Sequence, residues 1–318
     1  MPPGTFRPVA LSVVVPCYNE QAGLIEFHRR MTQACVGCVG QDYELVCIDD
    51  GSRDATWRIM QDLAGTDANL VAVKLSRNHG HQLALTAGLF QCRGARILVI
   101  DADLQDPPEL LPTLMAMMDQ GADVVYCQRR HRAGETRFKR WTAALFYRVL
   151  RRLADIDIPP DTGDFRLLSR RALDVLNRMP EQSRFIRGMV TWIGMKQVPL
   201  LYDRQSRFAG ETKYPLSKML RFAVDAITGF SVLPLRWASV LGAIAAGLSI
   251  VMLAYTLGSW ALGHTVEGWT SVTTLVLLTS SAQLIVLGII GEYLGRLVVE
   301  AKRRPLFVIE QVVQRPQT

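Results

Sequence analysis

The sequence predicts an α/β domain with a mostly parallel sheet, followed by a transmembrane hairpin of two helices. The first prediction depends on short β-branched runs that alternate with amphipathic stretches through residues 11–129. This alternation is typical of parallel strands joined by helices. The second depends on two long segments, 237–262 and 268–291, that contain no charged residue.

The expected elements of the α/β domain follow each other regularly as far as residue 129. Strands are expected at 11–16, 43–49, 70–76, 95–101 and 123–129, with helices at 20–35, 54–65, 80–92 and 107–121. Later residues indicate a short strand and a helix within 161–176, a helix at 183–194, and a strand within 196–208 that leads away from the compact domain. A last apolar run, 303–313, could pack back on the domain as a strand.

The two uncharged segments are long enough to cross a bilayer. At about 1.5 Å per residue, a helix of either length spans a hydrocarbon core of roughly 30 Å. Two buried helices of a soluble core are the alternative, which the uninterrupted lengths disfavour. The loop between the segments has no Lys or Arg, whereas basic residues flank them on the outer sides, namely Arg221, Arg236, Arg296, Lys302, Arg303 and Arg304. Basic flanks stay in the cytoplasm, so both termini are expected there.

Four regions are therefore expected along the chain. They are a cytoplasmic α/β domain at 1–205, an amphipathic juxtamembrane segment at 206–232, the hairpin at 233–295 with spans at about 237–262 and 270–291, and a cytoplasmic tail at 296–318. No signal peptide is expected at the amino end. The six cysteines indicate a reducing compartment, and the single Cys-x-x-Cys at 35–38 is not expected to bind metal.

Charge and missing motifs restrict the class of ligand. The formal net charge is +7, and residues 129–152 contain nine Lys or Arg against one acid, Glu135. Such a cluster favours a phosphate group or an anionic membrane surface, although a solvated helix face is the simpler alternative. No G-x-G-x-x-G follows the first strand and no P-loop motif occurs, which argues against those two nucleotide sites. No nucleic-acid partner is expected.

The stretch "ILVIDADLQDPPEL" at 97–110 places several acids directly after a buried strand. Asp101 and Asp103 are two residues apart, so on an extended chain both side chains reach the same side. With the neutral oxygen of Gln105 they form an all-oxygen set suited to Mg²⁺ or Mn²⁺. Asp106 precedes Pro107 and is expected to cap a helix. The acidic turn "DDGSRD" at 49–54 follows another strand. Ligands bind outside the carboxyl ends of such strands, so residues 16–20, 49–52, 77–78 and 101–105 are all expected to line one crevice.

Several motifs in order carry a resemblance to a known family. "VVVPCYNE", "IDDGSRD", "RNHGHQLALTAGL", "DADLQDPPE", "TGDFRLLSRR" and "RFAGETKYP", followed by two spans ending in "GIIGEYLGR", resemble glycosyltransferase family 2. Within it, the chain is most similar to the polyprenyl-phosphate glycosyltransferases of the bactoprenol glucosyltransferase type. The resemblance covers nearly the whole chain. It implies a GT-A fold, in which a Rossmann-like sheet domain binds a nucleotide sugar.

The resemblance also implies roles for individual residues. The nucleotide sugar would be held by Pro16, Tyr18, Glu20, Asp49, Asp50, Asn78 and Asp101. Asp103, Gln105 and Asp101 would hold the metal at the donor diphosphate, and Asp103 and Asp164 would be catalytic, Asp164 as a base or an orienting group. The acceptor phosphate would meet the basic residues Arg129, Arg137, Lys139, Arg140, Arg207 and Lys213.

The implied reaction is an inverting transfer of one hexose to undecaprenyl phosphate at the bacterial inner membrane. The Q-x-x-R-W motif of processive synthases is absent, since "QSRFIRG" stands at 182–188. UDP-glucose is the first expectation for the donor, and GDP-mannose, UDP-4-amino-4-deoxy-L-arabinose or a UDP-N-acetylhexosamine are the alternatives. A catalytically inactive membrane scaffold is the alternative of another class. A homotetramer is expected on the resemblance.

Overall fold

The computed structural model describes residues 8–130, 159, 162–204, 231–262 and 268–315. The chain divides into two compact units. One contains the sheet together with the tail at 304–318, and the other contains the two long carboxyl-terminal helices. The predicted boundaries at 205, 232 and 295 stay a prediction.

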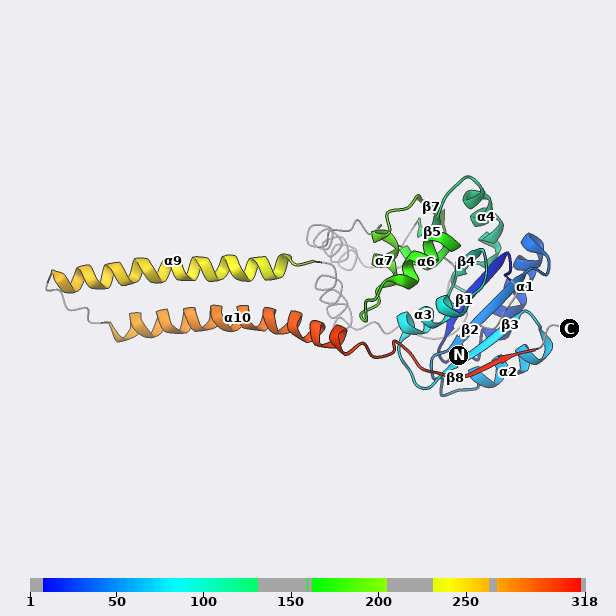
Figure 1. Ribbon diagram of the computed structural model, residues 1–318, viewed down its shortest axis with the longest axis horizontal. Helices are drawn as coiled ribbons and strands as arrows, with labels where there is room; N and C mark the ends of the chain where they lie inside the picture. Colours follow the sequence, from blue (N-terminus) through cyan, green and yellow to red (C-terminus); the bar gives the residue numbers. More distant parts are fainter. Residues whose placement is uncertain (1–7, 131–158, 160–161, 205–230, 263–267, 316–318) are drawn as a thin grey trace. The chain divides into compact units, whose positions relative to one another are not determined.

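The first unit is built on one sheet with the strand order β7-β5-β6-β4-β1-β2-β3-β8 (Figure 1). The strands are β1 Leu11–Cys17, β2 Tyr43–Asp49, β3 Leu70–Leu75, β4 Arg96–Val99, β5 Val124–Arg129, β6 Thr162–Ser169, β7 Gln197–Tyr202 and β8 Ile309–Gln314. Parallel pairs join β4, β1, β2 and β3, while β6 runs antiparallel to both β4 and β5. The predicted α/β fold with a mostly parallel sheet is confirmed.

Helices cover the central strands. They are α1 Leu24–Val39, α2 Thr56–Thr66, α3 His81–Gln91, α4 Leu111–Asp119, α6 Arg170–Arg178 and α7 Ile186–Trp192, with a 3₁₀ turn, η1, at Pro108–Leu110. Every residue of β1 and β2 is buried, as expected of strands covered on both faces. Helix α3 approaches this core closely, because a Cβ at Gly88 would lie 2.4 Å from Val14 Cγ1 and 2.5 Å from Ile48 Cδ1.

The strand expected within 196–208 does not lead away from the domain. Strand β7 pairs in parallel with β5 along its whole length and closes one end of the sheet. The tail strand behaves as expected: β8 pairs antiparallel with β3 at the other end, and Phe307 packs on Phe90 of α3 with ring centroids 6.0 Å apart. Both ends of the sheet are therefore completed by residues that come late in the sequence.

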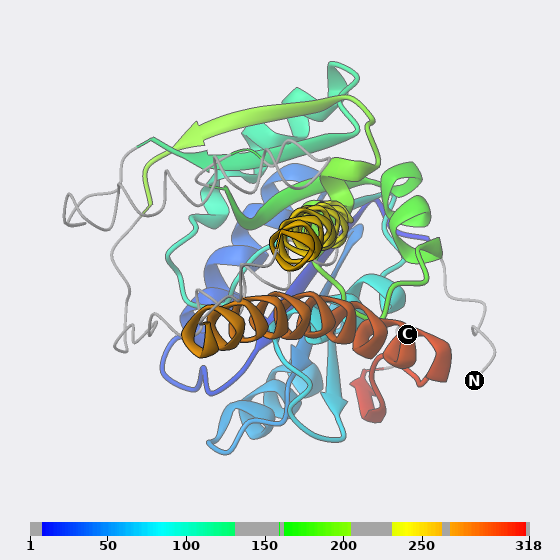
Figure 2. The same cartoon turned by 90° about the vertical axis from the view of Figure 1, so that its left-hand side faces the viewer.

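The second unit contains α9 Leu233–Ala261 and α10 Trp269–Lys302, which lie side by side (Figure 1, Figure 2). Their stretches 233–255 and 278–302 are long and apolar enough to cross a membrane, judged by length and composition. Six per cent of the first stretch and none of the second is buried inside the protein. The Tyr293 hydroxyl donates a hydrogen bond to the Ser231 carbonyl at 2.6 Å and ties the two helices together at one end.

Candidate active site

A cavity of about 370 Å³ opens at the carboxyl ends of the central parallel strands. It brings together many of the residues that the sequence predicted, namely Pro16, Tyr18, Glu20, Asp50, Asn78, Asp101 and Asp103. Cys17, which belongs to the predicted stretch 16–20, also lines it, as do Gly80 and His81. Asp49, Gln105 and Asp164 are not among its lining residues. The loops after four strands therefore converge on one space, where ligands of open parallel sheets bind.

The loop after β3 is held in place by Asp50. Its Oδ1 accepts a hydrogen bond from the His79 amide at 2.7 Å, and its Oδ2 accepts one from the Gly80 amide at 2.9 Å. The Asn78 side chain returns a hydrogen bond to the Asp50 carbonyl at 3.0 Å. Gly51 has a φ of +67°, and a Cβ there would lie 2.6 Å from the Asn78 amide, so the turn after β2 requires glycine. Asp50 thus shapes one wall of the cavity.

Asp49 lies deeper than Asp50. Its side chain is fully buried, its Oδ1 accepts a hydrogen bond from the Ser52 amide at 3.2 Å, and its Oδ2 has no hydrogen-bond partner among the described residues. Burial raises the pKa of this carboxyl above its ordinary value. Asp54 Oδ1 accepts a hydrogen bond at 3.0 Å from the amide of Thr56, the first residue of α2.

Asp101 and Asp103 project from the loop after β4. Asp101 Oδ1 is buried without a hydrogen-bond partner in the described part of the chain, and it lies 3.7 Å from His81 Nε2. Burial raises the pKa of Asp101 to about 6. Asp103 Oδ1 accepts a hydrogen bond from the Gln105 amide at 3.1 Å, across Leu104, whose φ of +58° is unusual for a residue with a side chain. The contact that the structure shows for Gln105 is therefore through its backbone.

The expected helix cap at Asp106 is wrong. The side chain is buried and accepts a hydrogen bond from the Tyr202 hydroxyl, and no side chain caps η1. The physical reason is that Pro107 and Pro108 have no N–H to offer a capping group. Asp106 instead connects the loop after β4 to the end of β7.

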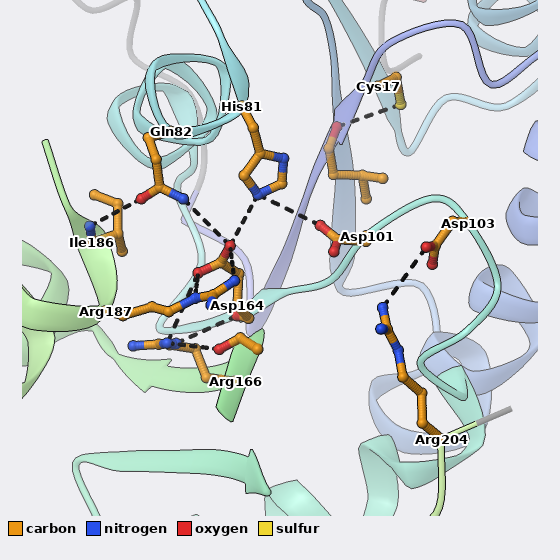
Figure 3. A network of polar contacts seen from close by, with 12 residues as sticks. Cys17, His81, Gln82, Asp101, Asp103, Asp164, Arg166, Ile186, Arg187 and Arg204 are labelled. Atoms are coloured by element: carbon orange, nitrogen blue, oxygen red, sulfur yellow. Dashed lines mark hydrogen bonds and ion pairs between the residues drawn. The ribbon is translucent and has the colours of Figure 1, made fainter. Parts of the chain in front are cut away.

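Asp164 is the centre of a second polar cluster (Figure 3). Arg187 donates to its two oxygens from Nε at 2.8 Å and from Nη2 at 3.0 Å, and the Gln82 side chain donates at 3.3 Å. His81 Nε2 lies 3.0 Å from Asp164 Oδ2, so it contacts both Asp164 and Asp101. Gln82 also accepts the Ile186 amide at 3.0 Å, which fixes the start of α7 to the start of α3.

Charges and hydrogen bonds within this cluster shift the pKa values of Asp164 and His81 in opposite directions. Burial alone would raise the pKa of Asp164, but the charge of Arg187 and the hydrogen bonds from His81 and Arg187 lower it well below the ordinary value. Burial alone would lower the pKa of His81, but its hydrogen bond to Asp164 and the charge of Asp101 raise it to about 9. The carboxylate of Asp164 is therefore stabilised in its ionised form, with both oxygens hydrogen-bonded.

His81, Gln82 and Arg187 are the residues that sequence reasoning missed. His81 is 83 residues from Asp164 in the chain, and no local pattern relates the two. The available signal was that α3 opens with two polar residues and continues with a mostly apolar run, of which residues 84–89 are buried in the structure. A polar helix start beside a predicted crevice can contribute to a site, because its side chains face the carboxyl ends of the strands.

Five of the six basic residues expected at the acceptor phosphate lie outside the described residues, namely Arg137, Lys139, Arg140, Arg207 and Lys213. Arg129 ends β5, does not line the cavity, and its Nη2 would lie 3.4 Å from a Cβ at Gly163. Within the described ranges, no group of three or more His, Cys, Asp or Glu side chains is arranged to hold a metal by itself. All six cysteines are unpaired.

Comparison with known proteins identifies the family of the chain. The pattern of the family described as "Glycosyl transferase family 2" matches residues 12–176, which run from the second residue of β1 through β6 and most of α6. The chain is 44% identical over 306 residues to "Uncharacterized glycosyltransferase YkcC" of Bacillus subtilis, covering 96% of this chain and 94% of that one.

The names of two further relatives include the lipid bactoprenol. "Prophage bactoprenol glucosyl transferase homolog" of Escherichia coli K12 is 36% identical over 309 residues, covering 95% of this chain and 99% of that protein. "Bactoprenol glucosyl transferase" of Shigella phage SfV is 35% identical over 312 residues, covering 96% and 99%. The alignments extend through the two long helices as well as the sheet domain. The chain belongs to glycosyl transferase family 2 and is a glycosyltransferase.

Proposed function

We propose that this glycosyltransferase transfers one hexose, glucose from UDP-glucose as the first choice, to undecaprenyl phosphate. The observation that carries the proposal is the cavity at the carboxyl ends of the strands, where Asp101 and Asp103 face the loops that would hold a nucleotide. The relatives named bactoprenol glucosyl transferase, which align over nearly their full length, support the choice of acceptor and sugar.

The residues present fit a divalent cation that is shared with the donor. Asp101 Oδ1 is buried and accepts no hydrogen bond within the described ranges, which is costly unless a cation or donor arrives. Asp101 and Asp103 would hold Mg²⁺ or Mn²⁺, with Gln105 as the third expected ligand, and the remaining positions would go to diphosphate oxygens and water. When bound, the ion would neutralise charge that develops on the leaving nucleoside diphosphate.

The chain's own residues explain the rest of the reaction. The bond from the anomeric carbon to the diphosphate breaks while a lipid phosphate oxygen forms the new bond from the opposite face, which inverts the configuration. Because the lipid phosphate is already an anion, no proton has to be removed from it. Asp164 keeps His81 pointed at the cavity, and the raised pKa of His81 makes it a hydrogen-bond donor there at neutral pH.

We place the sheet domain and both chain ends on the cytoplasmic face of a bacterial inner membrane. The two apolar helices support a hairpin, and the basic residues outside it, with none in residues 263–267 between the helices, support this orientation. The basic residues of 129–152 and 205–213 would then meet the acceptor phosphate near the bilayer. The expected homotetramer is a part of the proposal that rests on resemblance alone.

The test is transfer of label to lipid by the purified full-length protein. It is incubated with undecaprenyl phosphate in detergent and, one at a time, with labelled UDP-glucose, GDP-mannose, UDP-4-amino-4-deoxy-L-arabinose and UDP-N-acetylglucosamine. We expect organic-extractable product from UDP-glucose, and loss on the order of 10²-fold or more with a chelator or with Asp103→Asn. Equal product formation under both treatments contradicts the metal-dependent mechanism, and no product from any donor contradicts the proposed activity.

A further inference from the structure

Arg204, two residues after the end of β7, faces Asp103 of the loop after β4 (Figure 3). Its guanidinium also lies near Asp106, a second acid of that loop. Its Nη2 is 3.8 Å from Asp103 Oδ2, and its Nε is 3.5 Å from Asp106 Oδ1. Asp106 is 1% exposed and also accepts the Tyr202 hydroxyl. The guanidinium therefore lies between a buried acid that accepts the Tyr202 hydroxyl and an acid that lines the cavity. It pairs with both through charge, since its Nε has no hydrogen-bond partner among the described residues.

The two acids beside Arg204 differ in their access to the cavity. Asp106 is enclosed and has no route to a ligand, whereas Asp103 lines the cavity. At 3.8 Å the contact with Asp103 is an ion pair without a close hydrogen bond, so it acts through charge. The Arg204 side chain is 24% exposed, which limits screening by water.

A fixed positive charge at this place affects a cation and an anion in opposite ways. A divalent ion that approaches Asp101 and Asp103 alone meets repulsion from Arg204. A diphosphate that arrives with the ion brings negative charge, which attracts both cations. We propose that Arg204 makes divalent-metal binding depend on the nucleoside diphosphate, an inference that rests on the proposed function and assigns this residue a positioning role within it.

The test measures metal affinity without turnover. Full-length protein in detergent micelles is titrated with Mn²⁺, and free Mn²⁺ is followed by electron paramagnetic resonance, with and without saturating UDP as the diphosphate probe. The coupling is the ratio of the Kd for Mn²⁺ without UDP to that with UDP. We expect Arg204→Gln to tighten Mn²⁺ binding without UDP by about fivefold and to lower the coupling by roughly tenfold.

Two control variants distinguish an effect of the Arg204 charge from a general effect on the structure. Arg204→Lys keeps a cation and should retain most of the coupling. Arg171→Gln removes an arginine that pairs with Asp123 on the surface at 2.7 Å, and it should behave as wild type. Because coupling is reciprocal, the effect of Mn²⁺ on UDP affinity must change by the same factor in each variant.

The outcomes distinguish this inference from the proposed function. Unchanged coupling in folded Arg204→Gln, or equal loss in Arg204→Lys, overturns the role of Arg204 while the metal site stands. If Arg204→Gln weakens Mn²⁺ binding equally with and without UDP, the residue is only structural and the inference is also overturned. If wild-type protein binds no Mn²⁺ in either condition, both this inference and the metal-dependent mechanism fall.

Discussion

At the amino-terminal ends of β1 and β2, Glu44 is buried and both of its oxygens are hydrogen-bonded. Oε1 accepts the Ser12 hydroxyl and the Arg93 amide, each at 2.5 Å, and Oε2 accepts Arg93 Nε at 2.7 Å. At the carboxyl ends of the central strands, which we call the carboxyl edge, Asp101 Oδ1 and Asp49 Oδ2 are buried with no such partner in the described chain. The hydrogen bonds of Glu44 are complete, so we call the amino-terminal ends of the strands the closed edge. Asp101 and Asp49 each keep an oxygen with no hydrogen-bond partner among the described residues, so we also call the carboxyl edge the open edge. Buried acids at the two edges should therefore respond differently to the same change of carboxylate to amide.

Asp164 tests whether the effect of the substitution on stability depends on where the acid lies or on whether its hydrogen bonds are complete. It belongs to the carboxyl edge but is fully engaged, like Glu44. We expect Asp164→Asn to lower the free energy of unfolding by about 3–5 kcal/mol, because buried Arg166 and partly buried Arg187 lose their counter-charge. Urea unfolding at pH 7 measures it, and a loss below about 1 kcal/mol would show that the cluster is not stabilising.

The same carboxylate should make stability depend on pH. Because the pKa of Asp164 in the folded protein lies well below its ordinary value, its stabilising contribution is present above the unfolded pKa of about 3.9. That contribution is lost as the pH falls toward the folded pKa. The difference in unfolding free energy between wild type and Asp164→Asn should be largest at about pH 5–6 and shrink below pH 4. It should also shrink as the pH rises toward about 9, because the hydrogen bond to Asp164 helps to raise the pKa of His81 and this contribution is lost when His81 loses its proton. A difference that stays constant down to pH 3 would contradict this assignment.

Glu44→Gln makes the corresponding change at the closed edge. We expect a loss of about 3 kcal/mol in unfolding free energy, since the 2%-exposed acid is the partner of Arg93. The KM for the sugar donor should not change, because the network lies at the opposite end of the strands. Urea unfolding and donor KM on the same preparation test both parts. A change in KM without loss of stability would show that Glu44 supports donor binding and not the stability of the fold.

Asp101→Asn should give the opposite pattern. Its side chain is 30% exposed but its Oδ1 is buried, and its raised pKa means that the charged form is destabilised in the folded protein at neutral pH. We expect stability without metal to stay the same or rise by about 1 kcal/mol, while transfer falls on the order of 10²-fold. Urea unfolding in a chelator measures the first part. A clear loss of stability would mean that Asp101 is already satisfied by the fold.

The sequence predicted the regular features of the fold because they depend on local pattern. The strands at 11–16 and 43–49 are apolar runs, and their observed ends differ by at most one residue. The position of β6 between β4 and β5 was not predictable, since strand order depends on contacts between distant segments. The lining of the cavity followed from one rule about strand ends, which placed Asp50, Asn78, Asp101 and Asp103 together.

Errors arose where a local explanation was available for a long-range contact. Asp106 looked like a cap because it precedes two prolines, but its partner Tyr202 lies 96 residues later. His81 was not assigned to the site either, and its partner Asp164 lies 83 residues away in the sequence. Side chains that connect the loop after one strand to the end of another leave little trace in a single sequence.

Two serines allow the finest comparison of the edges. Ser12 Oγ donates to Glu44 and accepts the Gly94 amide at 2.6 Å, so Ser12→Ala leaves a buried amide unpaired and should cost about 1–2 kcal/mol with donor KM unchanged. Ser52 Oγ accepts the Asn19 amide at 3.0 Å in an exposed turn. Asn19 has a φ of 57° and lies between Tyr18 and Glu20, which line the cavity.

Ser52→Ala should therefore cost less than about 0.5 kcal/mol, because water can replace the lost hydrogen bond. It should nevertheless raise the donor KM by roughly threefold, since the left-handed residue that orients two cavity-lining side chains loses a support. Parallel urea unfolding and donor KM for the two variants decide the matter. If both serines affect stability alone, the loops at the carboxyl edge are held independently of this bond, and the division between a closed edge and an open edge applies to the acids only.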